Sequence, residues 1–326
     1  MKSRFLQISL LITILSTLSN YSQDVDLRIE TELITVPATV IDRQGRNIIG
    51  LKKEAFELFE NGSKQEIALF ETSEVPVTVL LLLDNSGSMN ELFDDLAEAA
   101  NVFVGQLKDD DQIIVATFAH EDKLNILCAA TKKRDFKQAI YLTSPEKDGL
   151  TTTFNAVHNA IKYMQQFSGR KSIVLFSDGE MYGKRISAKD NLYEAEEQDS
   201  VIYTVRFGAY PTAPIGYRPA LENVEQNGNS LGLSPKELQK VIDKVNGYMY
   251  GLAERTGGRG FEVERTKDLR YAFATISAEL RQQYRLGYYP TTSGKNGERR
   301  KIAVKVNIPD VAVRSRNEVV FRKNSN

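Results

Sequence analysis

The chain has 326 residues, enough for two domains with a sizeable hydrophobic core. Its 42 Lys and Arg nearly balance its 43 Asp and Glu, which argues against a general nucleic-acid binder, because such proteins carry a strongly basic domain. The single cysteine, Cys128, excludes an intramolecular disulfide, and its apolar neighbours Ile126 and Leu127 indicate a buried side chain rather than a nucleophile. The two histidines, His120 and His158, have no spacing typical of a zinc site or a catalytic dyad.

Residues 1–22 have the layout of an export signal. Lys2 and Arg4 precede an apolar stretch from Phe5 to Leu18, and the sequence Ser19-Asn20-Tyr21-Ser22 follows it. The stretch is short and interrupted by polar side chains, which favours cleavage over a permanent membrane span; the alternative is a disordered or core helix. No other stretch could span a bilayer. We therefore expect an exported protein that is periplasmic, on the cell surface or secreted.

Residues 23–74 show the two-residue period of β-strands. Apolar and polar side chains alternate within Leu27–Leu33, Phe56–Leu58 and Ile67–Leu69, and turn-forming Asn, Asp and Gly residues separate these runs. About four strands fit into this length, which is too few for a β-sandwich on its own.

Residues 75–280 change to alternating strands and helices. The predicted strands are short apolar runs: Val77–Leu83, Gln112–Phe118, Ser172–Phe176 and Val201–Phe207. Amphipathic stretches that begin at Leu92, Phe154 and Leu269 predict helices whose apolar sides pack on a sheet. This order is typical of a doubly wound α/β fold with a mostly parallel sheet.

Residues 209–246 interrupt this alternation with loop-like sequence rich in Pro, Gly and Asn. Pro235 to Val245 predicts a short helix with Ser234 as its N-cap. Long loops in compact domains are usually functional or mobile, so we interpret this insertion as part of a ligand-binding rim.

Residues 281–326 return to β-strand patterns at Tyr284–Tyr289, Lys301–Val306 and Val319–Phe321. Neither β end is large enough to stand alone. Together they supply about seven strands, near the number in an immunoglobulin-like sandwich. We predict one β-sandwich formed by both ends, with the α/β domain inserted between them; the alternative is two small β appendages.

The charge of the C-terminal segment is unlike that of the rest. Residues 281–326 hold eleven Lys and Arg and three acidic residues, a net charge of +8, and the remainder carries about −9. The simpler interpretation is a surface that complements an acidic neighbour. The alternative is contact with an anionic surface of the cell envelope.

A candidate site follows the first strand of the α/β region. The apolar run ends at Asp84, and two hydroxyls follow at alternate positions, Ser86 and Ser88. Ligands of open α/β sheets bind at the carboxyl ends of strands, and oxygens from a tight loop suit a hard cation. Two further loops, 147–153 and 177–180, fall at the same edge of the predicted sheet.

This constellation resembles the von Willebrand factor type A domain with its metal-ion-dependent adhesion site. The family pattern is Asp-x-Ser-x-Ser, a distant Thr and a distant Asp, and it is matched by Asp84, Ser86, Ser88, Thr151 and Asp178. The resemblance covers about residues 75–280 and implies a Rossmann-like fold. It also implies that these five residues hold a divalent ion of the Mg²⁺ type, with Mn²⁺ and Ca²⁺ as alternatives.

The flanking segments resemble bacterial, acidobacterial-type exported proteins that contain such domains. The similarity lies in Val40–Gly45, Phe56–Gly62 and Tyr284–Pro290. Two positions depart from the family: Leu150 stands where a second Gly is frequent, and Asn155 where Asp is frequent. Neither departure removes a metal ligand, although Leu150 bears on how the loop presents Thr151.

The resemblance implies a binding module rather than an enzyme. In the family geometry the three hydroxyls are neutral and the two carboxylates act partly through bound water, which leaves a divalent ion poorly neutralised. An Asp or Glu carboxylate of a protein partner then displaces one of the waters and completes the shell. The alternatives are a metal-dependent hydrolase or phosphotransferase, or a structural envelope protein with an unused site. A phosphatase with an aspartyl nucleophile would have a second Asp where Ser86 stands, which favours binding.

Overall fold

The computed structural model describes residues 33–72, 74–119, 123–143, 151–179, 186–207 and 235–321, without the side chains of Ser88, Pro235, Thr266 and residues 237–239, 241 and 242. The predicted export signal, most of the strand predicted at Leu27–Leu33 and most of the 209–246 insertion lie outside the described residues.

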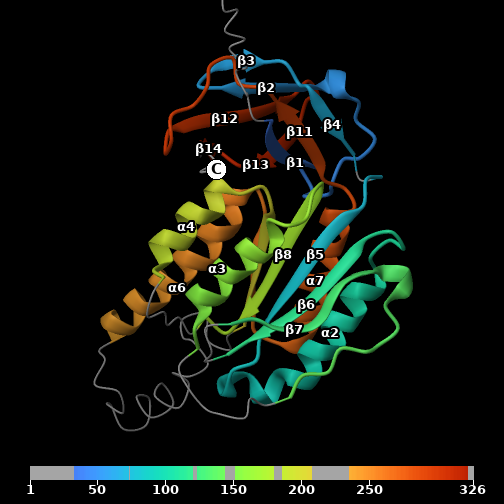
Figure 1. The fold of residues 1–326 in the computed structure, drawn as a ribbon, viewed down its shortest axis with the longest axis vertical. Coiled ribbons are helices and arrows are strands. Elements are labelled where there is room, and N and C mark those ends of the chain that lie inside the picture. Colours follow the sequence, from blue (N-terminus) through green and yellow to red (C-terminus); the bar gives the residue numbers. More distant parts are fainter. Residues whose placement is uncertain are drawn as a thin grey trace, which may run out of the picture. The chain divides into compact units, whose positions relative to one another are not determined.

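A central sheet of six strands forms in the described part of the α/β region, in the order β10-β9-β8-β5-β6-β7. Figure 1 labels β8, β5, β6 and β7 of this sheet. The strands are β5 (Val77–Asp84), β6 (Gln112–Phe118), β7 (Asn125–Lys132), β8 (Arg170–Ser177), β9 (Val201–Phe207) and β10 (Gly260–Val263). All neighbours are parallel except β7, which pairs antiparallel with β6 at the sheet edge. The mostly parallel sheet is confirmed, whereas β7 and β10 were not predicted.

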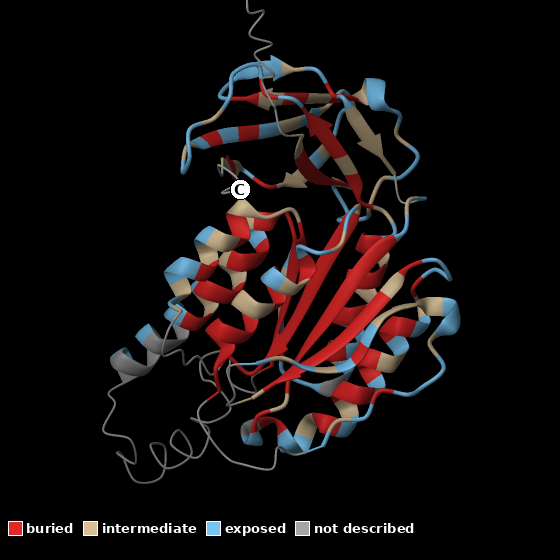
Figure 2. Ribbon diagram, in the orientation of Figure 1, coloured by how far each residue is buried: buried red, intermediate tan, exposed pale blue. Residues whose placement is uncertain are grey.

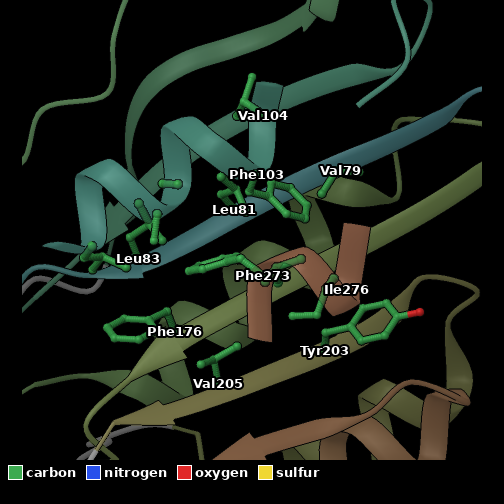
Figure 3. Close-up of a cluster of buried hydrophobic side chains, with 14 of the residues drawn as sticks. Val79, Leu81, Leu83, Phe103, Val104, Phe176, Tyr203, Val205, Phe273 and Ile276 are labelled. Carbon is green, nitrogen blue, oxygen red and sulfur yellow. The ribbon is translucent and has the colours of Figure 1, made fainter. Parts of the chain in front are cut away.

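Helices cover both faces of this sheet. They are α2 (Phe93–Gly105), α3 (Thr153–Met164), α4 (Ala188–Glu197), α6 (Pro235–Thr256) and α7 (Thr266–Leu280), and a 3₁₀ turn, η2 (Gly87–Leu92), precedes α2. Side chains of α2 and α7, such as Phe103 and Phe273, pack on one face (Figure 3). Those of α3, α4 and α6, such as Phe154 and Tyr248, pack on the other.

Strand β5 lies in the middle of the sheet and is buried along its whole length (Figure 2). Leu81 and Leu83 contact the α2 and α7 side, while Leu80 and Leu82 contact the α3, α4 and α6 side. A strand covered on both faces needs apolar side chains at every position, which explains its continuous apolar run.

The two ends of the chain form one β-sandwich, as predicted. Its sheets have the strand orders β13-β1-β11-β4 and β14-β12-β2-β3 in the described residues. The strands are β1 (Ile34–Asp42), β2 (Phe56–Glu60), β3 (Ser63–Gln65), β4 (Leu69–Glu71), β11 (Tyr284–Tyr288), β12 (Arg299–Val306), β13 (Val311–Ser315) and β14 (Glu318–Val320). Val36 opposes Leu286 and Leu58 opposes Val304, so each sheet is built from both ends and they share one core.

The helix predicted to end at Val245 is longer than expected. It begins at Pro235, as predicted, but continues to Thr256. Tyr248, Met249 and Leu252 in its second half are buried against the sheet. The short prediction was wrong because packing on the sheet, rather than the local sequence, stabilises the added turns.

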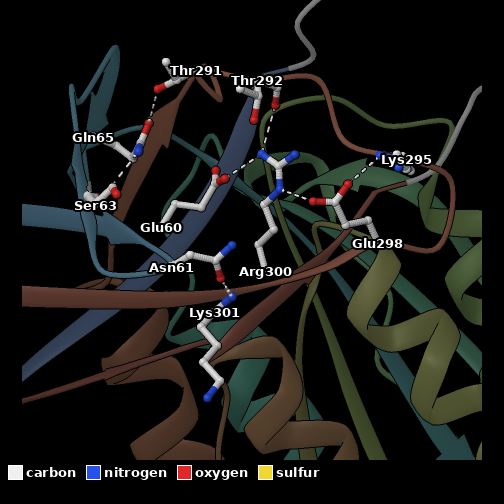
Figure 4. A network of polar contacts seen from close by, with 10 residues as sticks. All are labelled: Glu60, Asn61, Ser63, Gln65, Thr291, Thr292, Lys295, Glu298, Arg300 and Lys301. Carbon is white, nitrogen blue, oxygen red and sulfur yellow. Dashed lines mark hydrogen bonds and ion pairs between the residues drawn. The ribbon is translucent and has the colours of Figure 1, made fainter.

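Most arginines of the basic C-terminal segment are engaged inside the molecule. The Arg300 side chain, 4 % exposed, pairs with Glu60 and Glu298 (Figure 4). Other ion pairs in the segment join Arg285 to Glu71, Arg299 to Glu196 and Glu318, and Arg314 to Glu279. This pattern favours the simpler interpretation, in which the positive segment complements acidic neighbours in the same chain.

Two further features bear on the sequence predictions. Cys128 is buried on β7 and belongs to the hydrophobic core, as its apolar neighbours indicated. None of the helices in the described ranges combines the length and apolarity needed for a membrane span.

Candidate metal centre

The parallel strands bring several polar residues to one edge of the sheet. Asp84 is the last residue of β5 and pairs in register with Phe118 at the end of β6. On the other side of β5, Leu83 pairs with Phe176, so Ser177 and Asp178 follow at the same level. The loops after β5, β6 and β8 therefore leave the sheet together.

The Asp84 carboxylate is fully buried and held by its neighbours. Its Oδ1 accepts a hydrogen bond from the Ser86 backbone N–H at 3.0 Å, and its Oδ2 accepts one from Ser177 Oγ at 2.6 Å. Ser177 Oγ in turn accepts a hydrogen bond from the backbone N–H of Gly179 at 3.0 Å. These bonds fix the orientation of the carboxylate.

Asp178 places a second, fully buried carboxylate next to the first. Burial raises the pKa of Asp84 well above its usual value, and the negative charge of Asp178 raises that pKa further. Hydrogen bonds from Ser177 and Ser86 lower the pKa of Asp84 but do not outweigh these effects. Two neighbouring buried carboxylates favour a proton or a cation between them.

Thr151, which directly precedes α3, reaches the same edge because its segment is hydrogen-bonded to the residue after β6. Thr152 donates its backbone N–H to Ala119 O at 2.9 Å, and Asn85 donates its own to Phe118 O at 2.8 Å. The segment with Thr151 and the loop with Asp84 are thus both attached to the end of β6. Thr151 is 1 % exposed, and its Oγ1 has no hydrogen-bond partner among the described residues.

The structure places the five predicted ligands unequally. Asp84, Ser86, Asp178 and the Thr151 loop come together at the carboxyl edge of the sheet, and Ser86 is 4 % exposed. Ser88 lies in η2, directly after Ser86, but its side chain lies outside the described part of the chain. Leu150, expected to affect how Thr151 is presented, lies outside the described residues as well.

The role of Ser177 at this edge was not predicted, whereas Gly179 matches the turn expected after Asp178. Ser177 donates a hydrogen bond to Asp84. Gly179 has φ +89° and leaves no room for a side chain, because an added Cβ would lie only 2.6 Å from Val245 Cγ1 of α6. A signal for Gly179 was present, because Gly after Asp at a strand end indicates a turn. Nothing local indicates that Ser177 bonds a residue 93 positions earlier in the chain.

The donor set fits a hard divalent cation. It combines two carboxylates that repel each other with hydroxyl oxygens, one of which, Thr151 Oγ1, is buried without a partner among the described residues. Mg²⁺, Mn²⁺ and Ca²⁺ prefer such oxygens. The described residues contain no cluster of three or more His, Cys, Asp or Glu side chains, so a site based on nitrogen, sulfur or carboxylates alone is not formed by them.

A family model for the von Willebrand factor type A domain matches residues 78–229. The chain contains a von Willebrand factor type A (VWA) domain. The matched residues include β5, β6, β8 and β9 and therefore every strand end at the candidate centre. No match was found among curated proteins.

Solved structures with similar folds share little sequence with this chain. Proximal thread matrix protein 1 from the mussel byssus is 13 % identical, with TM-score 0.46; 75 % of this chain covers 50 % of that one. The conserved hypothetical protein BatB from Bacteroides thetaiotaomicron is 18 % identical, with TM-score 0.41, 63 % of this chain covering 98 % of that one. A von Willebrand factor type A protein from Catenulispora acidiphila is 10 % identical, with TM-score 0.40 and coverages of 91 % and 76 %. The chain thus spans half the length of the mussel protein.

Proposed function

We propose that this protein is a non-enzymatic, metal-dependent protein-binding module of the cell envelope. The observation that carries the proposal is the pair of buried carboxylates, Asp84 and Asp178, at the same sheet edge as the Thr151 hydroxyl, which has no hydrogen-bond partner among the described residues. Asp84, Ser86, Ser88, Thr151 and Asp178 would hold a Mg²⁺-type ion. The bound ion would supply a Lewis-acidic position open to an outside ligand.

The chemistry of this shell defines the partner. The five proposed ligands would leave one position of the octahedral shell of Mg²⁺ to a water, which an anionic oxygen can displace. An Asp or Glu side chain on a protein surface provides that oxygen. We therefore propose an acidic side chain of a protein as the ligand, and an adhesive role after export follows from the signal-like residues 1–22.

Hydrolysis or phosphoryl transfer is less well supported. Metal-assisted hydrolysis needs a group that activates water or protonates a leaving group. Ser86 and Ser177 donate hydrogen bonds to Asp84, and neither hydroxyl is a base that could activate water. A structural protein with an unused site is the remaining alternative.

Isothermal titration calorimetry of the full chain with Mg²⁺ and Mn²⁺ tests the metal assignment. We expect Asp84→Asn to abolish binding. The same change should raise the melting temperature in EDTA, because it removes the cost of burying a carboxylate and its repulsion by Asp178. The matched control is Asp111→Asn, a carboxylate that is also buried but binds Val77 N and Lys108 N at the opposite end of the sheet.

The control variant should lose stability and keep its metal affinity. Equal metal affinity in Asp84→Asn and the wild type would exclude this site. Capture of proteins from an envelope fraction with and without EDTA then separates the functions. Capture of a protein that EDTA prevents supports adhesion, and turnover of a phosphoester supports an enzyme. If neither is observed, the structural role remains.

A further inference from the structure

A second polar surface lies beside the candidate metal centre, between α4 and α6, which run side by side (Figure 1). It is a groove of about 550 Å³. Four cationic residues line it, Lys189, Lys244, Arg255 and Arg299, and no acidic residue appears among the described residues of its lining. Such a concentration of one charge is absent from the other described cavities of comparable size, whose linings mix both signs.

The two arginines are fixed and partly neutralised. Glu196, 5 % exposed, pairs with both Arg255 and Arg299, and Arg299 also pairs with Glu318. The two lysines are exposed, and neither forms an ion pair within the described part of the molecule. Lys189 and Lys244 are therefore the cations that remain to attract a ligand.

The groove also offers an apolar surface. Tyr193 is 41 % exposed, and its ring centroid lies 4.8 Å from the Arg299 guanidinium and 5.6 Å from the Lys189 ammonium. Leu192 and Tyr248 complete the apolar part of the lining. At Gly247 an added Cβ would meet no atom within 4 Å, so there is room for a side chain from outside.

The groove starts next to the candidate metal centre. Val245 of α6 packs against Gly179, which follows Asp178, and Lys244 precedes Val245. Tyr248 packs on Phe154 at 4.9 Å between ring centroids, three residues after Thr151. From Lys244 to Arg255 the helix rises about 16 Å, which spans about five residues of extended peptide.

We propose that this groove binds an acidic, extended peptide segment of the protein partner whose carboxylate occupies the metal centre. Peptide binding in the groove does not depend on the proposed function; only the placement of the partner's carboxylate at the metal centre rests on it. Negative side chains would face Lys189 and Lys244, and an apolar side chain would fill the space over Gly247 and against Tyr193. The apolar surface favours a peptide over a sulfated polysaccharide, which has no apolar group.

Fluorescence anisotropy with the full chain and a short labelled peptide of alternating Glu and Leu tests the groove. The measurement is made in Mg²⁺ and in EDTA. We expect Lys189→Glu combined with Lys244→Glu to weaken binding about tenfold or more in both buffers, because two attractions become two repulsions. The control is Lys301→Glu with Lys305→Glu, which changes net charge equally on exposed lysines of β12 and should alter affinity less than about twofold.

A second variant tests the groove without changing charge. Gly247→Leu places a side chain in the open space of α6, where Leu is a better helix former than Gly, and should also weaken peptide binding about tenfold. The wild type should bind a peptide with Gln in place of Glu no more tightly than Gly247→Leu binds the Glu peptide. Equal losses in the two double-lysine variants, or displacement by a sulfated polysaccharide at lower concentration than by peptide, would overturn the proposal.

The two proposals fail in different ways. If EDTA weakens peptide binding while Lys189→Glu with Lys244→Glu has no effect, the metal centre binds the peptide and the groove is excluded. If the lysine variant weakens binding in EDTA while Asp84→Asn leaves Mg²⁺ affinity unchanged, the groove binds the peptide and the metal assignment is excluded.

Discussion

At the scale of single residues, the candidate centre depends on contacts between side chains far apart in the sequence. Asp84 is oriented by Ser177 from the neighbouring strand, and Asp178 lies beside it. A carboxylate that is buried, hydrogen-bonded and close to a like charge is costly to maintain without a cation. The chain keeps this arrangement at the strand ends, where α/β sheets bind ligands.

Ser177→Ala isolates the positioning of Asp84. It removes the hydrogen bond to Asp84 Oδ2 and leaves the Gly179 N–H without its acceptor. We expect Mg²⁺ affinity to fall about tenfold, as for other groups that orient metal ligands, and the free energy of unfolding to fall by about 1 kcal/mol. Calorimetry and urea denaturation measure the two effects.

The control for this prediction is Ser172→Ala on the same strand. Ser172 Oγ donates to Val201 O at 2.9 Å, far from Asp84. This variant should lose similar stability and retain its Mg²⁺ affinity. A parallel loss of metal affinity in both serine variants would contradict a specific role for Ser177.

Glu298 gives a prediction about pH. Hydrogen bonds from Arg300 and from the Lys295 backbone lower its pKa below the usual value of 4.5 (Figure 4). A carboxyl with a lowered folded-state pKa stabilises the fold above its unfolded pKa, and this contribution is lost as the pH falls through the folded pKa. Glu298→Gln should therefore lower the melting temperature at pH 7. At pH 3 the melting temperatures of the variant and the wild type should differ less, and scanning calorimetry measures both. A constant difference at all pH values would refute this linkage.

At the scale of elements, close backbone contacts fix how α6 joins the sheet. Gly257, with φ +81°, ends the helix, and Gly258 then packs against β9. A Cβ on Gly258 would overlap the Ile202 carbonyl oxygen and lie 2.9 Å from its carbon. Because both atoms belong to a central strand, neither can move aside cheaply.

Gly258→Ala should therefore lower the free energy of unfolding by at least about 2 kcal/mol. The matched control is Gly247→Ala in the same helix, where the added methyl meets open space. It should raise stability by up to about 1 kcal/mol, because alanine favours helix. Urea denaturation compares the two, and a tolerated Gly258→Ala would show that the contact relaxes.

At the scale of the whole described molecule, buried arginines connect the β-sandwich and the VWA domain. Arg170, 5 % exposed, donates to Val75 O at 2.7 Å and to Leu280 O, the two points where the chain enters and leaves the domain. Arg316 of the sandwich, also 5 % exposed, donates to Glu196 O and Gln198 O at 2.9 Å each. Burial lowers the pKa of Arg316 to about 10, which leaves it charged at neutral pH.

Arg170→Met should lower the free energy of unfolding by about 3 kcal/mol, because the buried Leu280 carbonyl and the partly buried Val75 carbonyl lose a charged donor. An exposed arginine offers the control: Arg270 pairs with Glu98 at 3.3 Å, and Arg270→Met should cost less than about 1 kcal/mol. Guanidinium denaturation followed by circular dichroism measures both. Equal costs would show that Arg170 does not hold the junction.

The sequence alone determined the elements that carry strong periodic signals. The apolar run that ends at Asp84 specified a buried central strand, because only a strand covered on both faces needs apolar residues throughout. The alternation in residues 301–306 likewise specified a strand with one buried face. The sandwich from both ends followed from counting strands that could not form a core separately.

Only the tertiary structure decided the features that depend on distant partners. The edge strand β7 and the second half of α6 owe their stability to packing on the sheet, which no local pattern reveals. The contact of Ser177 with Asp84 and the lysine groove next to Gly179 arise because parallel strands and crossing helices bring separate segments together. A sequence specifies which side chains can bind an ion or a peptide, whereas the fold decides which of them meet.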